Sequence, residues 1–187
     1  MYTQIEKACE TLRAGGVILY PTDTIWGIGC DATNPDAVRR VYELKRRADH
    51  KAMILLVASK ADVEALVGAV PAEAAMLIDD PGRPTTVVYD RCRGVAEALK
   101  GADGSVGVRV THEEFSRELC RAFGRPLVST SANISGEPAA RSFDEISPEI
   151  IAGVDFAVDW RREPEPPASP SRVVRVTADG NVTVLRP

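Results

Sequence analysis

Short apolar segments alternate with amphipathic segments along almost the whole chain, and this alternation constrains the fold more than any other feature of the sequence. The expected strands are short and largely apolar, and they cover residues 17–20, 53–57, 85–89, 106–110, 126–130 and 156–158. The expected helices, counted with their caps, cover residues 3–14, 34–44, 61–67, 72–79, 94–99, 111–123 and 143–152. Strands that alternate with helices form a sheet with helices on its faces. The sequence therefore predicts an α/β fold.

Capping residues set the expected helix starts. Thr3 and Thr111 each precede a glutamate by three residues, which is the spacing of a capping box. Asn34 followed by Pro35 predicts an N-cap and a first helical residue.

The end of the chain departs from the alternation. Residues 161–171 hold four prolines in a polar context, which predicts an exposed loop or a lid. Residues 172–177 and 182–185 flank Asp179-Gly180-Asn181 and predict a hairpin. A terminal hairpin adds antiparallel pairing to a sheet otherwise built through helical crossovers. We expect one domain over residues 1–187 with a twisted, open, mixed sheet.

The charge distribution indicates a localised anion site. The 187-residue chain has a net charge of -4, which disfavours long-range attraction to nucleic acid or anionic membranes. Residues 39–51 are the exception, because their six basic and two acidic side chains give a local charge of +4. No apolar run approaches the roughly 20 residues that span a bilayer, and the N-terminus lacks a signal-peptide pattern. We therefore expect a cytoplasmic protein without membrane attachment.

Cysteine, histidine and paired aspartates give no reason to expect a metal site. The four cysteines show no C-x-x-C spacing, so reduced, mostly buried thiols are expected. His50 and His112 are more typical of surface or capping residues than of bases. Asp79-Asp80 precedes Pro-Gly and predicts a turn rather than a Mg²⁺ site.

Polar side chains gather where two of the expected strands end. Thr22 and Thr24 follow the first strand, and the strand at 126–130 ends in a polar run that contains Ser129, Ser131 and Asn133. Ligands of open α/β sheets bind outside the carboxyl ends of strands. Arg109 alternates with valines in its own strand, so its guanidinium must lie at a sheet edge or in a lined cavity, and its charge needs a partner.

Lys45 and Arg47 are candidates for phosphate binding. Residues two apart point the same way only in extended chain, so both can contact one ligand only if the helix ends near Lys45. An ammonium and a planar guanidinium together suit a triphosphate. Neither a P-loop nor a G-x-G-x-x-G motif is present. Taken singly, each polar cluster is more typical of a simpler role, such as a cation at a helix end or a turn, and Trp26 is more typical of a core residue.

Seven segments, in order along nearly the whole chain, resemble the YrdC-like L-threonylcarbamoyl-adenylate synthase family in its short, single-domain form. They are YPTDTIWGIG at 20–29, the K-x-R of 45–47 with Lys51, PGRPTTVV at 81–88, SVGVRV at 105–110, PLVSTSANISGEP at 126–138, SPSRVV at 169–174 and VLRP at 184–187. One such segment would be weak evidence, but seven in order are specific. The resemblance implies a twisted, open α/β sheet with a deep, positively charged cavity.

The resemblance also implies a reaction. The family condenses L-threonine, bicarbonate and ATP to L-threonylcarbamoyl-AMP and pyrophosphate. Downstream proteins use the product for N6-threonylcarbamoylation of adenosine in tRNA. ATP is thus a substrate, and Mg²⁺ is expected to travel with it, held mainly by phosphates and water. No covalent enzyme intermediate is expected.

Site residues follow by similarity. The polar residues around the nucleotide, which are also the candidate catalytic residues, are Lys45, Arg47, Ser131 and Asn133. Two further positions, Ser105 and Arg186, match residues that face ATP. The candidate L-threonine ligands are Thr22, Thr24, Arg109, Ser129 and Ser171, with Arg109 as the partner of the carboxylate.

Three departures from the family pattern leave alternatives open. Ala48 stands where proline is common, Arg83 interrupts the P-G-P-x-T segment, and Arg172 replaces a threonine. These departures allow a paralogue of the YciO type. A second hypothesis is a non-catalytic module that binds nucleotides or double-stranded RNA, with the +4 segment giving weak RNA binding. A third is carbamoyl transfer to another acceptor.

Overall fold

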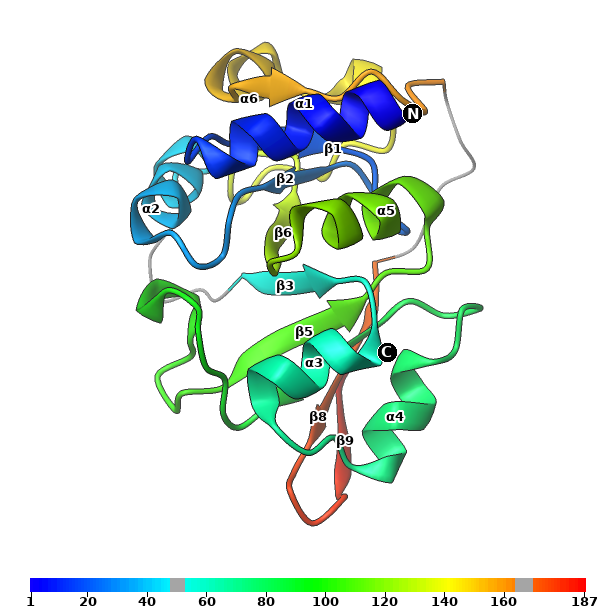
Figure 1. The fold of residues 1–187 in the computed structure, drawn as a ribbon. Helices are drawn as coiled ribbons and strands as arrows, with labels where there is room; N and C mark the ends of the chain where they lie inside the picture. Colours follow the sequence, from blue (N-terminus) through cyan, green and yellow to red (C-terminus); the bar gives the residue numbers. More distant parts are fainter. Residues whose placement is uncertain (48–52, 164–169) are drawn as a thin grey trace.

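One mixed sheet organises the molecule (Figure 1). The computed structural model describes residues 1–47, 53–163 and 170–187, and within these ranges nine strands lie in the order β7-β1-β2-β6-β3-β5-β4-β8-β9. The strands are β1 (Ile18–Tyr20), β2 (Gly27–Gly29), β3 (Ile54–Val57), β4 (Thr85–Tyr89), β5 (Val106–Val110), β6 (Leu127–Ser131), β7 (Phe156–Ala157), β8 (Arg172–Val176) and β9 (Val182–Arg186). The β1–β7, β3–β5 and β4–β8 pairs are parallel, and the β1–β2, β2–β6, β3–β6, β4–β5 and β8–β9 pairs are antiparallel. The predicted mixed α/β sheet is confirmed, and so is the predicted terminal hairpin.

Helices cover both faces of this sheet. They are α1 (Tyr2–Arg13), α2 (Pro35–Leu44), α3 (Lys60–Val67), α4 (Ala72–Ile78), α5 (Glu114–Phe123) and α6 (Pro148–Gly153). Consecutive strand residues point to opposite faces. In β1, Ile18 and Tyr20 pack in one apolar cluster with α1 and α5, whereas Leu19 packs in a second cluster with α2, α3 and α4. The two clusters are therefore the cores on the two sides of the sheet.

The cap predicted for α2 is confirmed. The Asn34 side chain accepts hydrogen bonds from the backbone N–H groups of Asp36 and Ala37, and Pro35 is the first helical residue. The capping box predicted at Thr3 is wrong, because α1 already begins at Tyr2 and Thr3 lies inside the helix.

The capping box predicted at Thr111 is also wrong. Glu113 is the N-cap of α5, and its carboxylate accepts from the backbone N–H groups of Phe115 and Ser116. The Thr111 hydroxyl lies 2.7 Å from the Ser116 hydroxyl instead. The longer glutamate side chain thus caps the helix two residues later than predicted.

Two predicted helices are shorter than expected. In 94–99 only Glu97–Leu99 forms a 3₁₀ turn, because Gly94 adopts a left-handed backbone with φ of 71° that a right-handed helix cannot include. The segment 143–152 divides into a 3₁₀ turn at Phe143–Glu145 and the helix α6. Pro148 begins α6, and Ser147 before it is extended, as a residue preceding proline prefers.

The expected buried thiols and the expected turn at the aspartate pair are confirmed. Cys9, Cys30, Cys92 and Cys120 are all free and buried. Asp79 ends α4, and the Asp80 carboxylate accepts from the backbone N–H of Gly82 in a turn. Across the described residues, the structure has no helix that is both long enough and apolar enough to span a bilayer.

Candidate active site

A cavity of about 340 Å³ draws its walls from segments that lie far apart in the chain. The lining residues are Thr22, Thr24, Ile25, Trp26, Gly27, Arg47, Met53, Ile54, Arg109, Ser129, Thr130, Ser131, Ala139, Pro170, Ser171 and Arg186. Most of the site residues proposed from the sequence are among them. The structure thus brings together the two hydroxyl-rich loops and three arginines.

Small residues on the central strands leave room for this cavity. Gly27 of β2 pairs with Ser131 of β6, and Ser129 pairs with Ile54 of β3. A Cβ on Gly27 would lie 3.2 Å from the Thr22 methyl group and 3.6 Å from the Ser129 hydroxyl oxygen. Larger side chains at these positions would fill the space, so glycine and serine there produce the hollow.

Lys45 connects the end of α2 to the polar segment at the end of β6. Helix α2 ends at Leu44 with Lys45 as its C-cap, which confirms the predicted helix end. The Lys45 side chain is buried, and its ammonium donates to the backbone carbonyls of Ser131 and Asn133, the latter at 2.7 Å. The Lys45 carbonyl in turn accepts from the backbone N–H of Ser135 at 2.8 Å. Burial lowers the pKa of Lys45 to about 8, and the nearby charge of Arg47 contributes.

Asn133 shapes the loop after β6 and is absent from the cavity lining. Its side-chain amide donates to the carbonyls of Ile134 at 2.9 Å and Glu137 at 2.8 Å. Its Oδ1 atom is buried and has no hydrogen-bond partner among the described residues. The geometry therefore gives Asn133 a role in holding the turn that presents Ser131.

The loop after β1 presents two hydroxyls to the cavity. The Thr22 hydroxyl donates to the Ile25 carbonyl at 2.7 Å and accepts from the backbone N–H of Thr24 at 3.2 Å. The two threonine hydroxyl oxygens lie 3.1 Å apart. Both hydroxyls therefore lie together at the cavity.

Arg109 lies in the cavity wall, as its position among valines required. The side chains of Val106, Val108 and Val110 enter the core on one face of β5, and the Arg109 guanidinium projects on the other. Its Nη2 lies 3.0 Å from Oδ1 of Asp23, and these side chains are only 4% and 8% exposed. Burial raises the pKa of Asp23, and Arg109 partly opposes this shift.

Sequence reasoning missed Asp23 as a site residue, because Thr-Asp-Thr after a strand is typical of a turn. The available signal was Arg109 itself, whose charge within a valine-rich strand needed a partner. Trp26 was expected only in the core, and it both packs edge-to-face on Phe143, with ring centroids 5.0 Å apart, and lines the cavity.

The C-terminal hairpin contributes the remaining wall. The Ser171 hydroxyl oxygen lies 3.0 Å from that of Thr86 in β4. The Arg186 guanidinium donates to the Ser171 carbonyl at 2.8 and 3.1 Å, and its Nη2 lies 3.3 Å from the Ser171 hydroxyl oxygen. Strands β8 and β9 thereby place both residues at the cavity.

Ser105 is one candidate that the structure does not bring to the cavity. It precedes β5, is absent from the lining, and its backbone N–H donates to the Asp103 carboxylate at 3.1 Å. Arg172, one of the departures, donates from Nε and Nη2 to the Thr85 hydroxyl at 3.2 and 3.0 Å. Thr85 and Thr86 are consecutive strand residues, so Arg172 lies on the face opposite Ser171.

Several positions singled out from the sequence are either outside the described residues or exposed. His50, Lys51 and Ala48 lie outside the described residues, as does most of the proline-rich segment. Arg83 is exposed.

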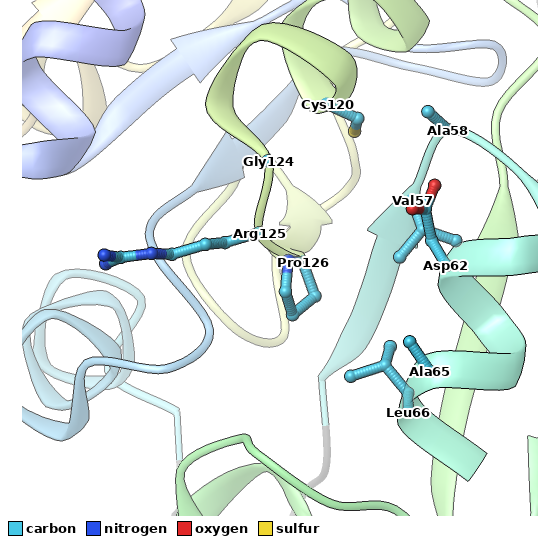
Figure 2. A pocket seen from close by; sticks show the side chains of 9 residues that line it. All are labelled: Val57, Ala58, Asp62, Ala65, Leu66, Cys120, Gly124, Arg125 and Pro126. Carbon is cyan, nitrogen blue, oxygen red and sulfur yellow. The ribbon is translucent and has the colours of Figure 1, made fainter. Parts of the chain in front are cut away.

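Two other hollows lack this combination of cations and hydroxyls. One, of about 110 Å³, lies between α3 and the end of α5 (Figure 2). Its Asp62 carboxylate accepts from the Ser59 hydroxyl, and Figure 2 shows the Arg125 side chain pointing away, toward its ion pair with Asp31 at 2.8 Å. The other, of about 560 Å³, lies beside Tyr89 at the end of β4, and its lining is mainly apolar with Asp90 and Arg91 as its charged residues. No group of three or more histidine, cysteine or carboxylate residues suited to a metal ion is found in the described part of the chain.

Comparisons with known proteins point to one family. The Sua5/YciO/YrdC family model, described as telomere recombination, matches residues 10–187. A threonylcarbamoyl-AMP synthase of Stenotrophomonas maltophilia is 41% identical over 83% of this chain and 85% of its own length. The Sua5 structure of P. abyssi with L-threonine superposes with a TM-score of 0.87 at 29% identity, over 98% of this chain and 53% of that one. This chain therefore spans about half of the P. abyssi protein.

A second solved relative has nearly the same length. The E. coli YciO structure superposes with a TM-score of 0.83 at 25% identity, over all of this chain and 89% of that one. The curated relatives are enzymes, threonylcarbamoyl-AMP synthases. The family match covers nearly the whole chain, and the chain belongs to the Sua5/YciO/YrdC family.

Proposed function

We propose that this chain is an L-threonylcarbamoyl-AMP synthase, which condenses L-threonine, bicarbonate and ATP and releases pyrophosphate. The observation that carries the proposal is the cavity in which Arg47, Arg109 and Arg186 meet the hydroxyls of two separate loops. The names of the curated relatives and the L-threonine bound to P. abyssi Sua5 support it. In structural superposition the identity is 29% to P. abyssi Sua5 and 25% to E. coli YciO, and curated relatives at 37–43% identity are synthases.

The reaction makes demands that such a cavity meets. The threonine amine attacks CO₂ with loss of a proton, or bicarbonate with loss of water, to give a carbamate. A carbamate oxygen then attacks the α-phosphorus, and the bond to the leaving pyrophosphate breaks. Two anions must come together, and negative charge builds on the leaving group. Fixed cations and close positioning therefore supply most of the catalysis, without a covalent enzyme intermediate.

Roles follow from where the side chains lie. Arg109 would bind the threonine carboxylate with its planar guanidinium, and the nearby hydroxyls would bind the amine and side chain of the substrate. Those hydroxyls belong to Thr22, Thr24, Ser129 and Ser171. Arg47 would bind the triphosphate. Lys45 would hold the loop after β6 in place and add positive charge near the phosphates.

The nucleotide side of the cavity would be formed by Ser131 and the turn held by Asn133, with Arg186 at its rim. Ser105 does not line the cavity, so it would contact only a part of ATP that extends beyond the lining residues. No carboxylate is among the lining residues in the described ranges, so Mg²⁺ arriving with ATP would be held by phosphate oxygens and water. The adenylate product would serve N6-threonylcarbamoylation of tRNA by downstream modification proteins.

Pyrophosphate release tests the proposal. ATP and bicarbonate are supplied with and without L-threonine, and wild type is compared with Lys45→Ala, Arg47→Ala and Arg46→Ala. Arg46 is the matched control, because its exposed guanidinium pairs with Glu149 at 2.7 Å outside the cavity. We expect threonine-dependent release that falls about 100-fold or more in Arg47→Ala and less than about twofold in Arg46→Ala.

Other results would select the alternatives. Release that needs another acceptor in place of threonine would indicate carbamoyl transfer elsewhere. Absence of ATP turnover together with salt-sensitive RNA binding that persists in Arg47→Ala would indicate a non-catalytic RNA-binding module.

A further inference from the structure

We infer that Asp23 is a positioning residue for the amino-acid substrate, because its carboxylate holds the Arg109 guanidinium in the orientation that receives the threonine carboxylate. The inference rests on the proposed function, since it concerns the threonine half of the same cavity. Asp23 is assigned no contact with the substrate. It acts through Arg109.

The ion pair joins two elements that are not neighbours in the sheet. Asp23 lies in the loop after β1, and Arg109 lies in β5, with β2, β6 and β3 between these two strands (Figure 1). Four strand spacings amount to about 19 Å. The loop therefore reaches across the sheet face to the Arg109 side chain, and the contact at 3.0 Å fixes it there.

The loop that carries Asp23 also lines the cavity. It bends at residues 23–25, and the Thr22 hydroxyl is held by the Ile25 carbonyl and the backbone N–H of Thr24. Thr22 and Thr24 line the cavity, whereas Asp23 is absent from the lining and contacts Arg109. The Asp23–Arg109 contact therefore attaches this hydroxyl-bearing loop to β5.

Burial makes Arg109 depend on Asp23. Across the described residues the structure gives Arg109 no other ion pair, and its buried Nε has no hydrogen-bond partner. A buried charge that loses its only counter-charge is strongly destabilised. Without Asp23, the long Arg109 side chain would be expected to turn into the cavity toward water, and the defined fork for a carboxylate would be lost.

The geometry argues against a direct chemical role for Asp23. Its side chain is buried and absent from the cavity lining, and its Oδ1 lies 3.0 Å from Nη2 of Arg109. Arg109 separates the carboxylate from the cavity. The carboxylate therefore supplies charge and orientation to Arg109 rather than a base.

The test compares Asp23→Asn with Asp31→Asn. Asp31 is the matched control, because it is also a buried aspartate paired with an arginine, Arg125, at 2.8 Å, and it does not line the cavity. L-threonine binding is measured by calorimetry, and the KM values for threonine and ATP are measured by pyrophosphate release. We expect Asp23→Asn to weaken threonine binding about tenfold or more while the KM for ATP changes less than about twofold.

A second pair of variants separates positioning from loss of stability. In an Arg109→Ala background, Asp23→Asn is expected to cause no further loss of threonine binding, because its only route of action is gone. Asp31→Asn is expected to lower the melting temperature without changing the KM for threonine. If Asp23→Asn fails to melt cooperatively, Asp23→Glu serves instead, since it keeps the charge and displaces the carboxylate by one methylene.

The outcomes are distinct. Unchanged threonine binding in a folded Asp23 variant, or an equal loss in Asp31→Asn, overturns the inference. If wild-type protein binds threonine but shows no threonine-dependent pyrophosphate release, the proposed function is rejected. The calorimetric comparison of threonine binding then still decides the role of Asp23.

Discussion

The ammonium of Lys45 lies 2.7 Å from the carbonyl oxygen of Asn133 and also contacts the carbonyl of Ser131, so one buried cation joins the end of α2 to the loop after β6. Arg47 follows two residues later and lines the cavity with Ser131. Lys45 ends α2 and also contacts the loop after β6, so it sets the spacing between Arg47 and Ser131. Its charge state should matter for both stability and activity.

Activity should fall as Lys45 loses its proton. The pKa of Lys45 is lowered to about 8, so the ammonium is charged below that pH and increasingly neutral above it. We expect kcat/KM for ATP in the pyrophosphate assay to decline above pH 8, because a neutral amine no longer adds positive charge to the phosphate site. Lys45→Arg, which stays charged, should lack this decline, and the same decline in Lys45→Arg would contradict the assignment.

Stability should change with the opposite sign. The pKa of Lys45 is lower in the folded state than its ordinary value of 10.5, so between about pH 8 and pH 10.5 the unfolded chain binds more protons. The contribution of Lys45 to the free energy of unfolding therefore rises with pH in this window. Urea denaturation of wild type and Lys45→Met at pH 7.5 and pH 9.5 checks it, since only wild type contains this contribution. A difference between the two proteins that does not depend on pH would contradict the prediction.

The parts of the site that sequence could predict are those governed by local rules. The Asn34-Pro35 start of α2 and its end at Lys45 depend on capping and on residues two apart, and both are confirmed. The alternation of Arg109 with valines is equally local. It predicted that the guanidinium lies at a sheet edge or in a cavity, and the structure places Arg109 in the cavity wall. Local periodicity also suffices for most of the strands.

The parts that sequence could not predict depend on contacts across the sheet. The Asp23–Arg109 pair bridges strands four positions apart, and no local pattern encodes that register. The failure of the capping box at Thr111 has a different, local cause, because the Thr111 hydroxyl pairs with the Ser116 hydroxyl while Glu113 caps the helix. Only the family resemblance, and no spacing, suggested which distant residues share one site.

Gly29 should tolerate no side chain. A Cβ there would lie 2.7 Å from Cε1 of Tyr20 and 2.8 Å from the carbonyl oxygen of Val128, and both neighbours are held in the core. We expect Gly29→Ala to lower the free energy of unfolding by about 1–3 kcal/mol, as overpacking does. Urea denaturation measures it, with Gly82→Ala as the control.

Gly82 is the appropriate control because a Cβ there would meet only the carboxylate of Asp80, an exposed side chain, at 3.3 Å. Its substitution should change stability by less than about 0.5 kcal/mol. Equal denaturation midpoints for Gly29→Ala and wild type would show that β1 and β2 are less tightly packed than the structure indicates.

The hydroxyl pair of Thr86 and Ser171 should behave as a coupled unit. Both residues are buried and their hydroxyl oxygens lie 3.0 Å apart. Ser171→Ala leaves the Thr86 hydroxyl buried without this partner, at a cost of about 1–3 kcal/mol, and Thr86→Val leaves the converse defect. The double variant should cost less than the sum of the two, because both groups are then removed together. Denaturation of the four proteins gives the coupling, and strictly additive losses would mean that the pair contributes nothing.

The four thiols should be slow to react in the folded protein. Burial raises the pKa of Cys9, Cys30, Cys92 and Cys120, and the thiolate is the reactive form. With a colorimetric disulfide reagent at pH 8, we expect the native protein to react about 100-fold or more slowly than a free thiol, and the denatured protein to titrate all four groups. Cys92 is 8% exposed, more than the other three, so it should react first. Cys92→Ser should remove the fastest phase, and a fast phase that survives this substitution would place an accessible thiol elsewhere in the fold.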